Sequence, residues 1–141
     1  MTALPDSVRE VIESGALAHL VTLNDDGSPQ ITCVWAGLDG DEIVCGHVPH
    51  LRKLENLERD PRVALSMEAE GTGARGLTRH LIVYGTAKIT KGGAPELLQR
   101  LADRYLGPDV EFSPKPDPPP GYVTHISVER VAGEGPWASK A

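Results

Sequence analysis

Residues 46–63 read GHVPHLRKLENLERDPRV, and the rest of the chain can be ordered around this stretch. It follows an apolar run, turns at Val48-Pro49-His50, and brings Arg52 and Lys53 into the first turn of a predicted short helix. Asp60-Pro61 ends that helix, because the residue before a proline is disfavoured in the helical region. Free amides at a helix start, beside a guanidinium and an ammonium group, favour an anion. We therefore predict that Arg52 and Lys53 hold the phosphate of a cofactor.

Three apolar segments before the helix predict antiparallel strands. Ala16–Asn24 and Ser28–Ala36 are joined by Asp25-Asp26-Gly27, and Asp and Gly tolerate the positive φ of a tight hairpin turn. Residues 37–41 predict a second hairpin turn, which leads into a third strand at Glu42–His47. Short turns between consecutive strands predict an antiparallel meander.

Three more strands follow the helix. Arg62–Ala69 begins directly after it, Thr78–Thr90 alternates apolar and polar residues over a long run, and Tyr122–Val131 is the last strand. Gly85 interrupts the long strand and predicts a bulge or a sharp bend, as where a sheet curls into a barrel. Six antiparallel strands with one bend predict a small split β-barrel with flanking helices.

Two further helices complete the prediction. Residues 5–15 carry an apolar face suited to cover an open end or face of the sheet, and Pro95–Leu106 carries a buried stripe without chemistry. The proline-rich stretch 109–121 predicts an extended surface segment that either lies across a neighbour or lines a cleft, where it would shape the rim. The small Ala64 and Ser66 share one strand face, and either a flat ligand or a packed helix would fit there.

Composition narrows the functional classes. The chain has 141 residues, which predicts a single domain over residues 1–141, and 14 basic against 20 acidic residues give a net charge of −6. An acidic chain argues against nucleic acid and membrane surfaces as partners. Neither a secretory signal nor an apolar run long enough for a membrane is evident, so we predict a cytoplasmic protein with Cys33 and Cys45 reduced.

No catalytic or metal-binding pattern is evident in the sequence. His47 and His50 lie close together without a third ligand, so no metal site is predicted. A catalytic residue cannot be assigned, although Tyr84, His80 and His47 are candidates to donate a proton, and solvent could serve instead. A cofactor would then carry the reaction, while the protein supplies binding, orientation and electrostatics.

The string RKLENLERDPRV, together with NDDGSPQITCVW before it, resembles the pyridoxamine-phosphate-oxidase-like split-barrel superfamily. Within that superfamily the chain is most similar to the actinobacterial oxidoreductases that depend on the deazaflavin coenzyme F420. Three further stretches fit this branch, namely GLTRHLIVYGTAKIT, the following GAPELLQRLADRY and the closing PPGYVTHISVERVAGEGPW. The resemblance therefore covers nearly the whole chain. It does not distinguish decisively between F420 and FMN. The further residues that pyridoxamine phosphate oxidases use for a pyridoxal-type substrate are not found.

The resemblance implies a homodimer with cofactor sites at its interface and a small-molecule substrate. It places the cofactor phosphate at Arg52 and Lys53, the flat ring against the strand around Gln30, Thr32 and Val34, and the neighbouring wall at Gly46 and His47. The other subunit would contribute Arg79, His80 and Trp137, and a carboxylate-rich cofactor tail would meet Arg59, Arg62, Arg75 and Arg79.

Three functions are compatible with the sequence. The first is transfer of hydride from reduced F420 to an electron-poor acceptor. The second is an FMN-dependent flavin reductase or oxidase of the same fold. The third is a protein that binds F420, flavin or haem without turnover, which agrees with the lack of an evident acid–base residue.

Overall fold

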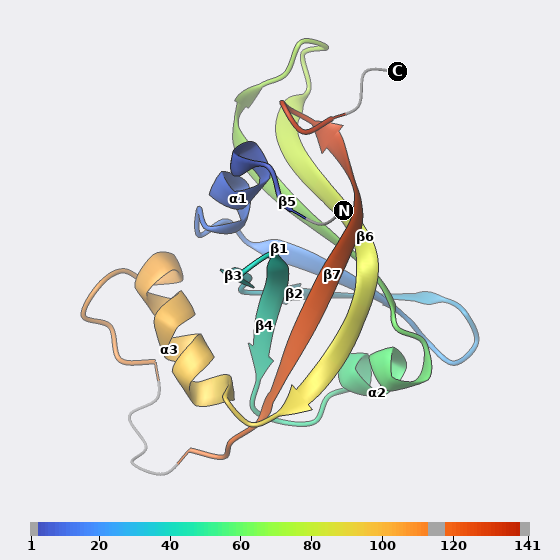
Figure 1. Ribbon diagram of the computed structural model, residues 1–141, viewed down its shortest axis with the longest axis vertical. Coiled ribbons are helices and arrows are strands. Elements are labelled where there is room, and N and C mark those ends of the chain that lie inside the picture. The colour runs from blue at the N-terminus through green and yellow to red at the C-terminus, as the bar shows by residue number, and fades with distance from the viewer. Residues whose placement is uncertain (1–2, 113–117, 139–141) are drawn as a thin grey trace.

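Seven antiparallel strands form one strongly curved sheet in the computed structural model, which describes residues 3–112 and 118–138 (Figure 1). Three helices pack around this sheet. In chain order the elements are α1 (Asp6–Ile12), β1 (Ala18–Leu23), β2 (Pro29–Val34), β3 (Gly37–Asp39), β4 (Glu42–His47), α2 (Arg52–Arg59), β5 (Arg62–Thr72), β6 (Thr78–Lys91), α3 (Ala94–Tyr105) and β7 (Tyr122–Glu134).

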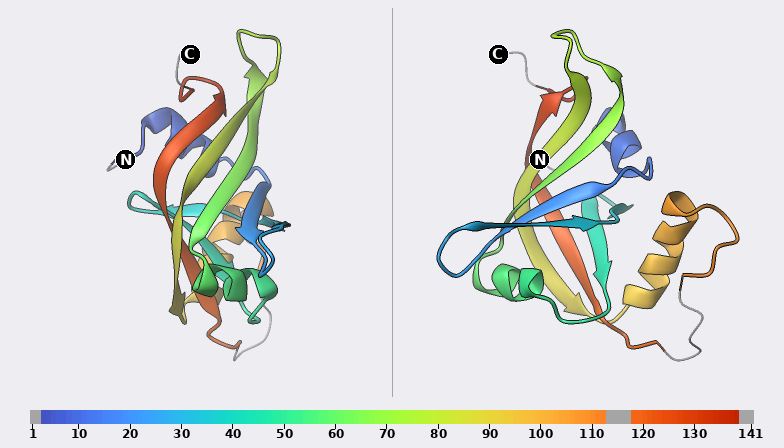
Figure 2. Two further views of the ribbon diagram at one scale, coloured as in Figure 1. Left: turned by 90° about the vertical axis from the view of Figure 1, so that its right-hand side faces the viewer. Right: turned by 180° about the vertical axis from the view of Figure 1, so that it is seen from behind.

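The strand order confirms the predicted split β-barrel. The order is β2-β1-β5-β6-β7-β4-β3, so β2 and β3 form the two edges of the sheet. Only Trp35 and Ala36 separate these two strands in the chain, and the sheet must therefore roll up to bring its edges together. Figure 2 shows the resulting barrel from two further sides.

Two details of the predicted strand pattern are wrong. The sheet has seven strands and not six, because Gly37–Asp39, predicted as part of a turn, pairs with β4 through Leu38 and Ile43. The three-strand meander does not form either, since β2 and β4 are not neighbours. The buried side chains of Ala36 and Leu38 give the reason: the chain crosses the barrel to bury them instead of folding back on β2.

The predicted bulge at Gly85 is confirmed. The pairing of β6 with β7 shifts between Tyr84, which faces Arg130, and Gly85, which faces Val128. A side chain at Gly85 would collide with the carbonyl oxygen of Ser127. Glycine is therefore required where β7 comes closest, and the extra residue in β7 bends the sheet.

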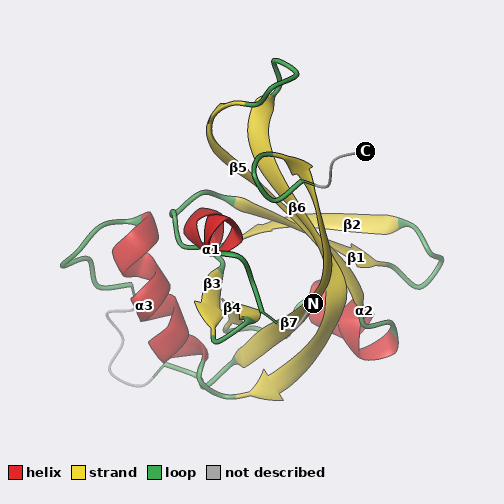
Figure 3. Ribbon diagram, turned by 45° about the horizontal axis from the view of Figure 1, so that its top comes forward, coloured by secondary structure: helices red, strands yellow, loops and turns green. Residues whose placement is uncertain are grey.

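The helices close and flank the barrel. α1 lies over one end, where Val8 and Ile12 join the interior cluster with Leu20, Leu65 and Met67 (Figure 3). α2 lies at the other end and adds Leu57 to the same cluster. α3 packs outside, against β4, through a second cluster. No helix in the described ranges is both long and apolar enough to span a bilayer.

Candidate functional site

A pocket of about 340 Å³ opens beside the start of α2. It is lined by β2 residues, by the end of β4, by the turn into α2 and by part of α3. Four of the residues predicted to bind a cofactor meet in it, namely Val34, Gly46, His47 and Lys53. We call this cavity the Lys53 pocket.

Among the described residues, Lys53 is the only cation that lines the Lys53 pocket, and it is buried. Its side chain is 7% exposed, and no hydrogen bond or ion pair joins its ammonium group to any residue in the described ranges. Burial lowers the pKa of Lys53, with the nearby Cys45 and Cys33 acting in the opposite direction. A buried charge is costly unless it is paired, so this ammonium favours an anionic ligand.

The buried thiol of Cys45 does not neutralise Lys53. Cys45 is fully buried, and burial raises its pKa to about 12, so it remains a thiol at neutral pH. Cys33 is exposed on β2, and neither cysteine forms a disulfide in the described residues. The positive charge of Lys53 is thus available to a ligand.

His47 forms a buried, neutral wall of the same pocket. It is 4% exposed, and its Nε2 lies 3.0 Å from Thr124 Oγ1. Burial, together with the charge of Lys53, lowers the pKa of His47 to about 4. Neutral His47 can exchange a hydrogen bond, but it is not a cationic acid at neutral pH.

His47 predicts how stability depends on pH. Its pKa of about 4 in the folded chain lies below the unfolded value of 6.5, so the unfolded state binds more protons between these values. We expect stability to be complete above pH 6.5 and to fall by about 3 kcal/mol as the pH drops to 4. Urea unfolding of wild type and His47→Gln between pH 6.5 and 4 measures this loss. In the variant, the free energy of unfolding should lack the part of its pH dependence that comes from His47. Parallel curves would contradict the assignment.

Gly46 lies where β4 and α3 approach each other closely. A Cβ atom there would be 3.0 Å from Leu98 Cγ and 3.5 Å from the carbonyl oxygen of Ala94. The glycine therefore allows α3 to pack on β4. Its predicted contact with a cofactor would come from the backbone, since it lines the pocket without a side chain.

Arg52 and Lys53 diverge from each other. Arg52 is exposed and faces a polar hollow of about 750 Å³ between α2 and the β1–β2 hairpin. Consecutive helical residues are turned by about 100° from each other, which sends the two cations to different cavities. The structure thus separates the predicted pair, and Lys53 alone of the two enters the Lys53 pocket.

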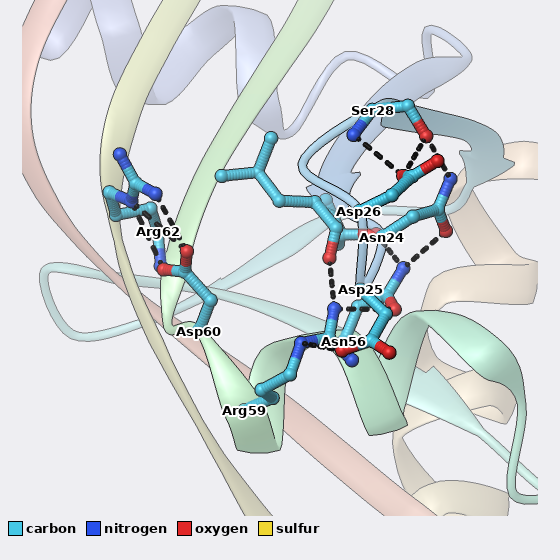
Figure 4. Close-up of polar contacts among 10 residues, drawn as sticks. Asn24, Asp25, Asp26, Ser28, Asn56, Arg59, Asp60 and Arg62 are labelled. Carbon is cyan, nitrogen blue, oxygen red and sulfur yellow. Dashed lines mark hydrogen bonds and ion pairs between the residues drawn. The ribbon is translucent and has the colours of Figure 1, made fainter.

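Asn56 ties α2 to the β1–β2 hairpin (Figure 4). The two N–H groups of its Nδ2 are shared among three acceptors, Thr22 Oγ1 at 3.1 Å, Asn24 Oδ1 at 3.1 Å and Gln30 Oε1 at 3.0 Å. Its Oδ1 accepts from Arg59 Nη2 at 3.1 Å. Asn56 is 2% exposed and lies one helical turn after Lys53, so this network fixes the face of α2 that carries the buried ammonium.

The predicted ring-contacting residues on β2 point into the barrel. Thr32 faces Leu20 across the strands, Val34 belongs to the interior cluster, and the amide oxygen of Gln30 is bonded to Asn56. Thr32 Oγ1 is buried without a hydrogen-bond partner in the described part of the chain. Because β2 is an edge strand, a ligand can instead use its unpaired backbone groups.

Arg79 and Trp137 lie away from the Lys53 pocket. Both line a hollow between α1 and the end of β5, and Trp137 Nε1 donates to the carbonyl oxygen of His80 at 3.1 Å. They are not brought to Lys53 within one chain. Any role at the site would require a second subunit, as predicted.

The arginines predicted to meet a cofactor tail are mostly engaged within the chain. Arg62 pairs with Asp60 at 2.7 Å, and Arg75 pairs with Glu134 at 2.6 Å. Arg59 donates to the carbonyl oxygen of Leu23 at 2.6 Å. These contacts place the arginines in separate structural roles.

The three candidate proton donors are dispersed. Only His47 lines the Lys53 pocket. Tyr84 lies on the outer sheet face beneath Arg130, at 4.1 Å from the guanidinium carbon, and His80 Nδ1 contacts the carbonyl oxygen of Thr78 at 2.8 Å. The structure therefore does not bring the three candidates together at one site.

Eight residues that line the Lys53 pocket were not predicted as site residues from the sequence, namely Leu17, Cys33, Trp35, Val48, Pro49, Leu51, Leu98 and Phe112. Strict alternation could have found Cys33, because it points to the opposite face of β2 from Thr32, and Trp35 directly follows the strand. Phe112 carried no sequence signal, because its contact with the pocket depends on how the segment after α3 returns. Ser113–Asp117, within the predicted proline-rich segment, lies outside the described residues.

The sequence pattern of the pyridoxamine 5'-phosphate oxidase family matches residues 4–134. An F420 reductase structure is similar to the chain, with a TM-score of 0.72, 25% identity and coverage of 92% of this chain and 98% of that one. The structure of HupZ from Group A Streptococcus has a TM-score of 0.67 and 20% identity, and the match covers 98% of this chain and 99% of that one. The structure of a conserved hypothetical protein from Mycobacterium tuberculosis has a TM-score of 0.67 and 24% identity, and the match covers 91% of this chain and 82% of that one. No curated protein matches the chain.

Proposed function

The chain belongs to the pyridoxamine 5'-phosphate oxidase family, and on that premise we propose that it is an oxidoreductase that uses reduced coenzyme F420. Its acceptor would be an electron-poor small molecule. The similar F420 reductase structure supports this choice of cofactor. The observation that carries the proposal is Lys53, a buried ammonium that has no partner in the described chain and lines a mainly apolar pocket.

The residues of the Lys53 pocket fit a flat cofactor with a phosphate. Lys53 would hold the phosphate, and neutral His47 would add a hydrogen-bonding group beside it. The free edge of β2 would offer backbone donors and acceptors to the ring near Val34. When bound, reduced F420 supplies a hydride for an electron-poor double bond, and solvent supplies the proton. The chain's own task is to orient the reactants and exclude water.

A spectral titration tests the cofactor. We expect purified protein to bind F420 tightly, to bind FMN and haem more weakly, and to reduce quinones or conjugated enones when reduced F420 is present. Tight FMN binding with FMN-dependent turnover would replace F420 by FMN. A tight complex without turnover of any acceptor would make the chain a binding protein.

Cys33 gives a readout of the same complex that does not depend on activity. It is exposed and lines the Lys53 pocket, whereas Cys45 is fully buried. Bound F420 should slow the alkylation of Cys33 by iodoacetamide, measured by mass spectrometry, while Cys45 stays unmodified throughout. Equal Cys33 labelling with and without saturating F420 would place the cofactor elsewhere.

The proposal includes a homodimer. A row of paired residues crosses the outer sheet face, namely Ile31, Val21, Ala64 and Tyr84. Ile31 is 64% exposed. None of these four residues belongs to either hydrophobic cluster, and each of them is at least partly exposed. An exposed apolar face beside the Lys53 pocket suits a second copy. Sedimentation should give twice the mass of one chain.

A further inference from the structure

An aromatic cluster lies at the mouth of the Lys53 pocket. Trp35 stacks on Tyr105 with ring centroids 5.2 Å apart and planes 14° from parallel. Phe112 meets the same indole edge-on, at 5.3 Å and 64°. Tyr105 is itself fixed, because its hydroxyl donates to the carbonyl oxygen of Ala16 at 2.6 Å and accepts from Ala36 N–H at 3.0 Å. Trp35 and Phe112 both line the pocket.

Gln99 on α3 holds the segment that carries Phe112. Its Nε2 donates to the carbonyl oxygen of Val110 at 2.8 Å, and its Oε1 accepts from Phe112 N–H at 2.9 Å. One amide side chain thus satisfies two backbone groups of an irregular segment. This double contact sets where Phe112 stands relative to Trp35.

The rim of the pocket is apolar and exposed. Leu17 is 49% exposed, Leu51 39% and Phe112 38%, and all three line the same cavity as Lys53. Exposed apolar side chains that converge on one cavity mark a site for an apolar ligand. The pocket therefore has a cationic interior beside an aromatic and aliphatic mouth.

We propose that Phe112 is a specificity-determining residue of the Lys53 pocket and that it selects flat conjugated acceptors, with Gln99 as its positioning residue. This inference rests on the proposed function, because it assigns the acceptor of that same site. A planar ring can stack or meet edges with Trp35 and Phe112, whereas a ring thickened by tetrahedral carbons cannot approach both. The class of acceptor is a quinone-like planar dione.

Two acceptors of similar size separate planarity from reactivity. Duroquinone is flat, and its full substitution prevents addition of the Cys33 thiol. Ketoisophorone is a related ene-dione whose ring carries two methyl groups on a tetrahedral carbon. The ratio of their kcat/KM values with reduced F420 measures selectivity, and calorimetry on the complex with oxidised F420 measures acceptor binding without turnover.

We expect Phe112→Leu to lower kcat/KM and affinity for duroquinone by about threefold to tenfold, the contribution of an aromatic pair beyond its buried area. Phe112→Tyr should retain both values, and ketoisophorone should change by less than about twofold with either variant. Equal losses for the two acceptors would overturn the selectivity. A weaker F420 complex with unchanged acceptor preference would assign Phe112 to the cofactor instead.

Gln99 variants test the positioning role. Gln99→Ala should reproduce the selectivity loss of Phe112→Leu. Gln99→Glu can still accept from Phe112 N–H but cannot donate to Val110, so its selectivity should lie between those of wild type and Gln99→Ala. Asp103→Asn, on the exposed side of the same helix, is the control. Unchanged selectivity in Gln99→Ala would refute the role of Gln99. If F420 supports no turnover, the proposed reaction fails, while duroquinone binding by the variants still decides whether Phe112 recognises flat ligands.

Discussion

Lys53→Met should abolish tight binding of F420 while making the folded chain more stable. Methionine keeps the length and apolar body of the side chain and removes only the charge. Loss of a buried charged partner for the cofactor phosphate should weaken the complex by about 100-fold, the effect of about 3 kcal/mol. A fluorescence titration of wild type and variant measures the dissociation constant.

The gain in stability has its cause in the same burial. Lys53 is 7% exposed, and no partner for its ammonium lies in the described residues, so the free protein carries the cost of desolvating the charge. Burial lowers the pKa of Lys53, which shows the same penalty on its charged form. Replacement by an apolar residue should therefore raise the free energy of unfolding by about 1 kcal/mol at neutral pH. Urea unfolding without cofactor measures this gain.

Arg52→Ala is the matched control. Arg52 adjoins Lys53 in the chain, but it is exposed and faces the other hollow. We expect its removal to change F420 affinity by less than about threefold, as for a solvated surface charge. A loss in Arg52→Ala equal to that in Lys53→Met would restore the two-residue phosphate site predicted from sequence. Unchanged affinity in Lys53→Met would remove the cofactor from this pocket.

The sequence predicted elements well where their signals are local. Asp60-Pro61 ends α2 as expected, and Gly85 marks a bulge because a glycine inside a long alternating strand permits the close backbone approach that a bulge requires. The connection at Gly37–Asp39 was missed, since a Gly-Leu-Asp-Gly-Asp run carries strong turn signals. Its path depends on burying Leu38 inside the barrel, which is a property of the whole fold.

The candidate site was predictable in part for the same reason. The helix start at Arg52 and Lys53 is a local feature, but their separation depends on which side of α2 faces the barrel. Gln30, Thr32 and Val34 share one face of β2, and their alternation fits a ligand-facing set and a core-facing set equally well. Partner strands decide between these two faces, and they are distant in the sequence.

Asn56→Asp should have the largest effect on stability at the site. The side-chain amide nitrogen of Asn56 has three oxygen acceptors within 3.1 Å, on Thr22, Asn24 and Gln30. A carboxylate oxygen in its place donates nothing and faces those oxygens at hydrogen-bond distance in a buried position. We expect a loss of about 3–5 kcal/mol, as for an uncompensated buried charge, which is a large part of the stability of a domain of this size.

This variant should also weaken cofactor binding, because Lys53 lies one turn before Asn56 on the same helix.

The loss of stability in Asn56→Asp has a distinctive dependence on pH. Burial would raise the pKa of the introduced carboxyl in the folded state above its unfolded value, so the folded variant binds more protons and regains stability as the pH falls through that pKa. The protonated carboxyl can donate one hydrogen bond again. Urea unfolding between pH 8 and pH 5 follows both effects.

Glu55→Gln is the control for Asn56→Asp, since Glu55 adjoins Asn56 and its side chain is 64% exposed. It should change the free energy of unfolding by less than about 0.5 kcal/mol at every pH. The acid-induced loss of stability through His47 is common to wild type and Asn56→Asp, so only the titration of the introduced carboxyl makes the two curves converge as the pH falls. A constant difference between them would show that the amide of Asn56 does not donate to the three oxygens and that α2 is held in place by its apolar contacts alone.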